Sequence, residues 1–576
     1  MTAYTIAALR AQYIEGTRTP EDVIDELVQA AADDTGNVWI HPPKKEALQP
    51  YLDALHELNQ EEVPLWGIPF AVKDNIDVAG MPTTAGAPAY AYTPTEHAPV
   101  VADLIRAGAI PVGKTNLDQF ATGLVGTRSP YGETHNALKP ELISGGSSSG
   151  SAAAVANGQV PFALGTDTAG SGRIPAALNG LYGWKASLGA WSTRGVVPAC
   201  ESLDCVTAFA RSMEDVTRID RVVRRFDPEH AWSRQLDEPA VNKPKRIFVP
   251  KEAPSFFGPY ADAYRKAWER ALKQAETLGI PVETLDTSGM EAVAEELYSG
   301  PFVAERWAAL GAFTEQHPGA VHEVTEAVLR TGEDGKHSAA SLFQAQHRTE
   351  KEKAKTKQAL SKSVLMLPTS GGTWSRDEVR QNPISTNSQM GAYTNHCNLL
   401  DLSAIALPAG EAAADVPFGI TFFATAEEEG LLFAVGQEWE NAKTDTMDLI
   451  VCGLHMRGYP LASQLEELGG TFVEEVTTAP AYQLYKLPTE PAKPGLIRSE
   501  QNGAAIEAER WRLPVDRFGE LLAHIPAPLG IGSITLSDET TAPGFLCEAY
   551  AAEQAEDVTT LGSWHRVTQK GYVSTK

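Results

Sequence analysis

The sequence predicts an α/β protein in which helices cover both faces of a sheet, followed by a second, smaller domain. The first observation is that short apolar runs, typical of buried strands, alternate with helical stretches of about ten residues or more. The second is the length of 576 residues, which exceeds the size at which a single core keeps growing. The third is a polar segment at residues 440–445, after which a new strand begins. We therefore expect domains over residues 1–443 and 444–576.

Charge and composition limit which partners the protein can bind and in which compartment it is expected. The chain has 74 acidic and 48 basic residues, a formal charge of −26, spread along its length. Such a surface repels phosphate backbones, so no nucleic-acid partner is expected. Five cysteines without a C-x-x-C pair argue against a disulfide framework or a zinc ribbon. We see no secretion signal and no apolar run near the roughly 18 residues of a membrane span, so we expect no membrane partner and a cytoplasmic location.

The N-terminal part predicts two helices and then a strand with one unusual residue. The helices fall within residues 1–32, and the second has Thr19 as its N-cap and Pro20 in its first turn. The apolar run over 65–72 predicts a strand that carries Lys73 inward among aliphatic side chains. A buried ammonium group is costly unless it is paired or neutralised, so Lys73 is a candidate functional residue.

The remaining elements continue the alternation, with one long helical interruption. Residues 145–173 contain a short helix and a strand between two clusters of glycine and serine. Residues from about 255 to 360 are rich in Glu, Lys and Ala with helical periodicity, which predicts a helical insertion. The other expected elements are helices over 99–107 and 431–439, and strands over 109–112, 364–367, 405–408, 418–423 and 449–451.

Taken alone, the glycine and serine clusters allow three interpretations. Residues 146–150 match the G-x-S-x-G pattern that would make Ser148 the nucleophile of an α/β-hydrolase, but the preceding segment 136–143 contains Pro140 and does not read as a strand. A phosphate-binding loop would need the spacing G-x-x-x-x-G-K-[ST], which the sequence lacks. The third interpretation is a glycine-rich turn without chemistry.

Three motifs in combination resemble the amidase-signature family. They are GIPFAVKDNID at 67–77, GGSSSGSAAAVA at 145–156 and GTDTAGSGRIPA at 165–176. The resemblance implies a mixed sheet covered by helices, and hydrolysis of an amide without a metal or an organic cofactor.

The resemblance also implies a Ser-Ser-Lys triad. In it, Ser171 is the nucleophile, Ser147 is a bridging serine that follows a cis peptide bond, and Lys73 is the general base. Lys73 must then be neutral to accept a proton, which requires its pKa to fall by roughly three units from about 10.4. Burial in the strand before it could supply that shift. The backbone N–H groups that would form the oxyanion hole belong to Thr168, Ala169, Gly170 and Ser171.

Two positions depart from the usual family pattern. Ala169 and Ser149 stand where most members have glycine. If position 169 required a positive φ, alanine would cost about 1 kcal/mol there. The prediction for the conformation of the oxyanion loop therefore depends on the sign of that φ, whereas the prediction of the triad does not.

A closer resemblance is to the allophanate hydrolases, a branch of this family. It implies a smaller α+β second domain with a gamma-glutamylcyclotransferase-like fold, and a small-molecule substrate, allophanate, which is a urea derivative with a carboxylate. The motifs are STRGVVPACESLDC at 192–205, LYSGPFVAERW at 297–307, VCGLHMRGYPL at 451–461, PAPLGIG at 526–532 and GFLCEAY at 544–550.

This second resemblance implies further site residues. Arg306 and Tyr298 would hold the substrate, because a guanidinium grips a planar carboxylate with two hydrogen bonds. From the residues alone, Arg306 could instead pair with Glu305 on a helix surface. Arg173, two residues after the expected nucleophile, is another polar candidate that could be structural. His455, at the end of the first strand of the second domain, would assist decarboxylation of the product released by the first.

The expected activity is hydrolysis of allophanate to ammonia and carbon dioxide. The resemblance further implies a homodimer and a functional link to urea carboxylase or to a triazine-degrading pathway. Two alternatives stay open: another amidase-signature activity on a short aliphatic or glutaminyl amide, and a catalytically silent binding protein on the same fold. The second domain counts against the first alternative, and the intact Lys73, Ser147 and Ser171 count against the second.

Overall fold

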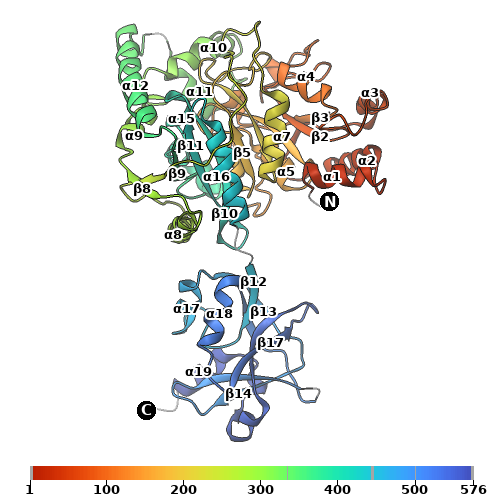
Figure 1. The fold of residues 1–576 in the computed structure, drawn as a ribbon, viewed down its shortest axis with the longest axis vertical. Helices are drawn as coiled ribbons and strands as arrows, with labels where there is room; N and C mark the ends of the chain where they lie inside the picture. Colours follow the sequence, from red (N-terminus) through yellow and green to blue (C-terminus); the bar gives the residue numbers. More distant parts are fainter. Residues whose placement is uncertain (1–3, 334, 443–445, 500, 573–576) are drawn as a thin grey trace. The chain divides into compact units, whose positions relative to one another are not determined.

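The computed structural model describes residues 4–333, 335–442, 446–499 and 501–572, and the chain forms two compact units (Figure 1). The first unit comprises residues 1–410 and 415–442, and the second comprises residues 411–414 and 443–576.

An 11-stranded mixed sheet is the centre of the first unit, with the strand order β1-β3-β2-β4-β6-β5-β10-β11-β9-β7-β8. Strand β2 is parallel to both β3 and β4, whereas β4, β6, β5 and β10 are successive antiparallel neighbours. The α/β fold class expected from the sequence is confirmed. The strands are β1 Trp39–His41, β2 Pro69–Lys73, β3 Ile110–Thr115, β4 Phe162–Asp167, β5 Tyr182–Lys185, β6 Cys205–Ala210, β7 Ile247–Pro250, β8 Val282–Leu285, β9 Val364–Pro368, β10 Leu402–Ala413 and β11 Val416–Thr425.

Helices pack on this sheet, with α5 against β2, β3 and β4, α7 against β6, and α6 and α16 against β11. The second helix begins as the sequence predicts, because Thr19 and Asp22 cap each other's backbone N–H groups and Pro20 is in the first turn. The helices are α1 Ile6–Ile14, α2 Pro20–Ala32, α3 Lys45–Leu55, α4 Pro99–Arg106, α5 Ser149–Ala156, α6 Ile174–Leu178, α7 Met213–Val223, α8 Ala261–Thr277, α9 Ser288–Glu296, α10 Val303–Gln316, α11 Glu323–Arg330, α12 Ala339–Ala359, α13 Arg376–Gln381, α14 Ser385–Met390, α15 His396–Leu399 and α16 Glu429–Asn441, with single 3-10 turns at Pro88–Tyr90 and Gln119–Ala121.

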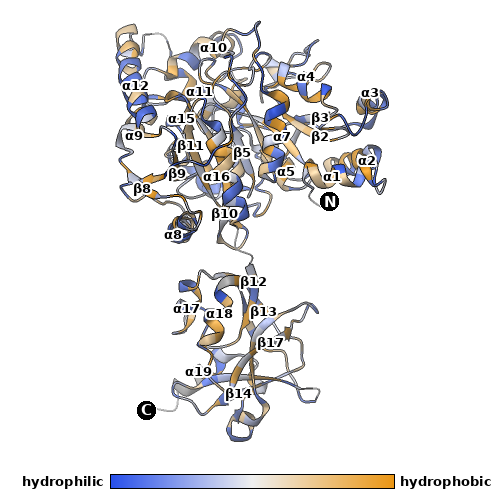
Figure 2. Cartoon of the chain, viewed as in Figure 1, coloured by the Kyte–Doolittle hydropathy of each residue, from blue (hydrophilic) through white to orange (hydrophobic). Residues whose placement is uncertain are grey.

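The segment expected to be a helical insertion contains α8 to α12 and one strand. Strand β8 adds to the edge of the sheet beside β7, and both lie outside β9. Figure 2 shows that α12 is largely hydrophilic along its length, in keeping with its few buried residues, Ala345, Thr349 and Thr356. This segment is therefore mostly helical, with one strand that extends the sheet.

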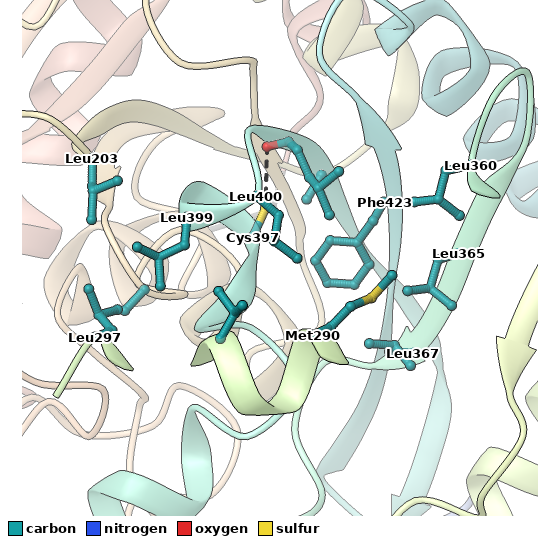
Figure 3. Close-up of a cluster of buried hydrophobic side chains, with 14 of the residues drawn as sticks. Leu203, Met290, Leu297, Leu360, Leu365, Leu367, Cys397, Leu399, Leu400 and Phe423 are labelled. Carbon is teal, nitrogen blue, oxygen red and sulfur yellow. Dashed lines mark hydrogen bonds between the residues drawn. The ribbon is translucent and has the colours of Figure 1, made fainter. Parts of the chain in front are cut away.

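A buried apolar cluster joins this helical segment to the sheet. Figure 3 shows Met290 near Leu367 of β9 and Phe423 of β11, with Leu297 on the other side of the same cluster. The cluster also contains the Ala169 side chain from the loop after β4, and Tyr298 packs against it. The hydrophobic core thus reaches the loop that was expected to form the oxyanion hole.

The second unit is a smaller α+β fold. It has a five-stranded sheet in the order β13-β16-β12-β18-β17 and a three-stranded sheet in the order β15-β14-β19. Its strands are β12 Thr446–Val451, β13 Thr471–Thr477, β14 Tyr482–Leu487, β15 Lys493–Arg498, β16 Glu507–Pro514, β17 Leu529–Thr535, β18 Thr541–Cys547 and β19 Glu556–Asp557, and its helices are α17 Ala462–Glu467, α18 Val515–Ala523 and α19 Trp564–Tyr572, with 3-10 turns at Ala549–Gln554 and Thr559–Leu561.

Candidate active site

Lys73 is the last residue of β2 and is completely buried. Its Nζ lies 2.7 Å from the Ser147 Oγ and 2.6 Å from the Thr166 Oγ1. Burial lowers the pKa of Lys73 from 10.5 to about 7, because desolvation outweighs the opposing effect of nearby carboxylates, Asp118 first among them. The lysine can therefore be neutral near pH 7 and accept a proton from Ser147.

Ser147 follows a cis peptide bond from Gly146, and α5 begins two residues later. A Cβ on Gly146 would collide with the Asp118 carboxylate, so only glycine fits at this position. The neighbouring Ser148 is fully buried and its hydroxyl lies 3.1 Å from the Thr166 carbonyl oxygen. The residues directly before Ser148 are all described and do not form a strand, so the geometry does not support the nucleophile-elbow interpretation.

Ser171 lies in the loop that follows β4. Because β2 and β4 are parallel neighbours, with Val72 beside Leu164, the C-terminal ends of both strands lie at one edge of the sheet. Lys73 and the Ser171 loop therefore belong to the same edge. Ser171 is 3% exposed, and its hydroxyl makes no hydrogen bond to any residue that the structure describes, which leaves it available to a substrate.

The backbone of the same loop is suited to bind an anion. The N–H groups of Ala169, Gly170 and Ser171 donate to no acceptor within the described residues. Gly170 has a φ of +141°, and a Cβ there would collide with the Thr394 side chain. Ala169 does not have a positive φ, and its methyl group packs in the apolar cluster, so alanine carries no backbone penalty there.

Arg173 is buried in an ion pair with Asp167. Its Nε lies 2.8 Å and its Nη2 2.9 Å from the two carboxylate oxygens of Asp167, and Nη2 also donates to the Thr394 carbonyl. The same carboxylate accepts the backbone N–H of Gly172. These contacts fix the backbone on either side of Ser171. They favour a structural role for Arg173 over substrate binding.

Arg306 extends from α10 and is completely buried. Its Nη1 lies 3.2 Å from the Thr122 Oγ1, and its Nη2 lies 3.3 Å from the Tyr298 hydroxyl, whose ring is 4.9 Å from the guanidinium carbon. The alternative pairing with Glu305 does not occur, because Glu305 accepts hydrogen bonds from the backbone and side chain of Ser202, both at 2.7 Å. Arg306 and Tyr298 are therefore in direct contact.

Asp204 is a buried acid that the sequence analysis did not select. Its carboxylate accepts hydrogen bonds from the Thr168 hydroxyl and from the backbone N–H groups of Ala199 and Cys200. Burial raises its pKa to about 6, with these hydrogen bonds opposing the shift. Asp204 thus connects the loop after β4 to the segment 199–204, and the hydrogen bonds between Ser202 and Glu305 connect that segment to α10. No motif spacing identifies such a link.

His455 follows β12 in the second unit and lines a cavity of about 70 Å³. Its Nε2 lies 3.0 Å from the Gln464 Oε1, and its ring stacks on Phe545 at 4.8 Å. Burial lowers the pKa of His455; the hydrogen bond with Gln464 opposes this shift, and the nearby Lys493 adds to it. Its imidazole is therefore neutral near pH 7, in a cavity that Lys493 and His524 also line.

Other features of the described residues concern metal sites, cysteines and membrane spans. They contain no group of three or more His, Cys, Asp and Glu side chains that could hold a metal ion. All five cysteines are free and buried. None of the helices in this part of the chain is long and apolar enough to cross a bilayer.

Both units match known protein families. The Amidase family matches residues 22–433, and the allophanate hydrolase C-terminal domain matches residues 447–569. The urea amidolyase of Lachancea kluyveri is 40% identical over 550 residues, which is 88% of this chain. This chain spans only 30% of that relative's length. A glutamyl-tRNA(Gln) amidotransferase protein of Symbiobacterium thermophilum is 42% identical over 257 residues, which cover 43% of this chain and 52% of that protein.

A solved structure resembles the whole chain. The allophanate hydrolase of Kluyveromyces lactis superimposes with a TM-score of 0.72 at 35% sequence identity, covering 98% of this chain and 99% of that one. The similarity therefore includes both units, which the match to the amidotransferase protein does not. The chain belongs to the amidase family, in the branch of the allophanate hydrolases that carries the allophanate hydrolase C-terminal domain.

Proposed function

We propose that this chain hydrolyses the terminal amide of allophanate, with Ser171 as nucleophile, Ser147 as proton relay and Lys73 as general base. The observation that carries this proposal is the fully buried Lys73, whose amine lies 2.7 Å from the Ser147 hydroxyl at the sheet edge where the Ser171 loop begins. A neutral amine in contact with a serine hydroxyl is what activation of a second serine requires.

The acylation step uses these groups in sequence. The Ser171 oxygen attacks the terminal carbonyl carbon while its proton passes to Ser147, and the Ser147 proton passes to Lys73. The free N–H groups of Ala169, Gly170 and Ser171 stabilise the negative charge on the carbonyl oxygen. The C–N bond then breaks, and ammonia leaves with the proton that the relay returns.

Water completes the first reaction. It attacks the acyl-enzyme, gives its proton to the same relay, and releases N-carboxycarbamate from Ser171. In the second unit, His455 assists decarboxylation of this product to carbamate and carbon dioxide, and the carbamate takes up a proton and loses a second carbon dioxide to give ammonia. An imidazole in a small, largely apolar cavity supports this role. It takes a proton from solvent, and the resulting imidazolium, acidic because its pKa is lowered, passes that proton to the nitrogen as the C–N bond to carbon dioxide breaks.

Arg306 and Tyr298 select the substrate by its carboxylate. Arg306 is buried without an ion-pair partner among the described residues, and its Nε has no hydrogen-bond acceptor there. A substrate carboxylate would supply both the ion-pair partner and the hydrogen-bond acceptor for Nε. The runner-up activity, hydrolysis of a short neutral amide, gives this cation no partner.

The assembly and the source of the substrate are part of the proposal. The chain acts as a homodimer, and its allophanate comes from an enzyme that carboxylates urea, with triazine breakdown as the alternative source. The longer relatives named urea amidolyase support the first source. Size-exclusion chromatography with light scattering tests the dimer, and a mass of about 62 kDa would contradict it.

Ammonia release by Ser171→Ala tests the nucleophile. We expect a loss of about four orders of magnitude or more in kcat, since a nucleophilic serine has no substitute. The matched control is Ser148→Ala, next to the relay serine, which should keep measurable turnover. If Ser148→Ala were inactive and Ser171→Ala active, the nucleophile would be wrongly assigned.

The pair allophanate and biuret tests the substrate, since biuret replaces the carboxylate by a neutral amide. Arg306→Ala should lose about 10- to 100-fold in kcat/KM on allophanate and much less on biuret. Equal losses on both, or a wild-type preference for biuret, would argue for the runner-up activity.

A further inference from the structure

Three arginines are buried in the part of the chain that the structure describes, and they differ in how their charge is balanced. Arg173 is paired with Asp167, whereas Arg128 (2% exposed) and Arg306 (0% exposed) have no carboxylate oxygen within 4.0 Å of a guanidinium nitrogen among the described residues. An unpaired buried guanidinium is costly. Such a pair of cations suits a site whose neutralising partner is an anionic ligand.

Arg128 and Arg306 meet at one residue, Thr122. Arg306 Nη1 donates to the Thr122 hydroxyl at 3.2 Å, and Arg128 Nη1 donates to the Thr122 carbonyl at 3.1 Å. Arg128 Nη2 donates to the Pro383 carbonyl at 2.8 Å. The Nε atoms of both arginines are buried and have no acceptor within the described residues.

The same segment contacts the catalytic relay. The backbone N–H of Arg128 donates to the Asp118 carboxylate at 2.9 Å, which also accepts the N–H groups of Val125 and Gly126. The backbone N–H of Asp118 donates to the Ser147 carbonyl at 3.0 Å. A continuous set of hydrogen bonds thus links Ser147, through Asp118, Arg128 and Thr122, to Arg306.

The charges around Arg128 fit this arrangement. Burial lowers the pKa of Arg128, Asp118 opposes that shift, and Arg306 adds to it by repulsion between like charges. The Asp118 carboxylate is occupied by backbone N–H groups. Of the two acids that influence Arg306, Asp204 is occupied by Thr168 and two backbone N–H groups, and Glu305 is occupied by Ser202. None of these carboxylates lies within 4.0 Å of a guanidinium nitrogen of Arg128 or Arg306.

We propose that Arg128 is a positioning residue that sets the preference for a carboxylate substrate. It fixes Thr122, the acceptor that orients Arg306, and its charge adds to that of Arg306 in a pocket for the carboxylate of a small amide. The inference rests on the proposed function, because it assigns a specificity role at the same site.

The experiment compares malonamate with malonamide, two amides that differ by a carboxylate in place of a neutral amide. For Arg128→Gln we expect kcat/KM on malonamate to fall by about 10- to 100-fold, mainly through KM, with a change of less than about threefold on malonamide. Arg128→Lys, which restores the charge, should recover much of the loss. The control is Arg265→Gln on the exposed surface of α8, which changes the net charge equally and should leave both substrates unaffected.

The outcomes separate the inference from the proposed function and from a folding defect. Equal losses on both substrates in a folded Arg128→Gln, or no recovery in Arg128→Lys, would show that Arg128 is only structural and overturn the inference. A wild-type enzyme without preference for malonamate would instead overturn the proposed function. If Arg128→Gln does not fold, Thr122→Val should lose the preference and Thr122→Ser should keep it; a retained preference in Thr122→Val also overturns the inference.

Discussion

Replacing Lys73 by methionine should abolish activity while making the first unit more stable at neutral pH. The native protein holds this amine with a pKa of about 7, whereas the unfolded chain exposes it with a value of 10.5. At pH 7 this difference destabilises the native state by about 4 kcal/mol, since each pKa unit corresponds to about 1.4 kcal/mol. Methionine has a side chain of similar length that does not ionise, so it avoids this cost.

The substitution also removes the contacts with Ser147 and Thr166, each of which contributes about 1 kcal/mol. The net gain at pH 7 is therefore about 2 kcal/mol. The sign follows from proton counting: between pH 7 and 10.5 the unfolded chain binds more protons at Lys73 than the native one, so wild-type stability rises with pH in that window. The advantage of Lys73→Met should shrink by about 2 kcal/mol from pH 7 to pH 9.

Denaturant unfolding of both proteins at pH 7, 8 and 9, followed by tryptophan fluorescence, measures this difference. Lys73→Arg is the matched control, because it keeps a charge that cannot be lost and should be strongly destabilised throughout. A Lys73→Met protein that is less stable than the wild type by the same amount at every pH would refute the lowered pKa of Lys73.

Three further predictions concern the same two units. The wild-type kcat/KM for ammonia release should fall tenfold per pH unit below about pH 7 as Lys73 gains its proton, measured by a pH–rate profile; a flat profile to pH 5 would contradict Lys73 as the base. Asp167→Asn should destabilise the first unit by about 3 to 5 kcal/mol in denaturant unfolding, because it leaves Arg173 buried and unpaired; a loss under 1 kcal/mol would argue against that ion pair as a structural element. His455→Ala should release the first ammonia at the wild-type rate but accumulate N-carboxycarbamate, visible by rapid ¹³C NMR, and unchanged carbon dioxide production would remove His455 from the second step.

The sequence was informative where chemistry depends on local patterns. The apolar run before Lys73 predicted a buried strand, and the structure places the lysine at its buried end. Strand β8 escaped prediction because it is a partly exposed edge strand with polar residues, so it lacks an apolar run. The concern about Ala169 also needed the structure, since the sign of φ is set by how the loop packs.

Long-range contacts were beyond sequence patterns. The sequence does not distinguish an arginine that pairs with an acid from one that does not. Arg173 pairs with Asp167, whereas Arg128 has no acidic partner among the described residues. The links of Thr122 to Arg306 and of Ser202 to Glu305 join residues more than 100 positions apart. Only the fold brings such residues together, so their roles could not be inferred from spacing.

The attachment of α10 through Glu305 and Ser202 has a consequence for redesign. The groups proposed to react, Lys73, Ser147 and Ser171, come from strands and loops of the sheet. The groups proposed to recognise the substrate come from the helical segment, with Arg306 on α10 and Tyr298 in the loop before it. That helix packs through Trp307 and Leu310 in a buried apolar cluster, and polar contacts of Glu305 and Arg306 add to this attachment. Exchanging residues along α10 should therefore retarget the enzyme toward other small amides while the reaction machinery stays intact.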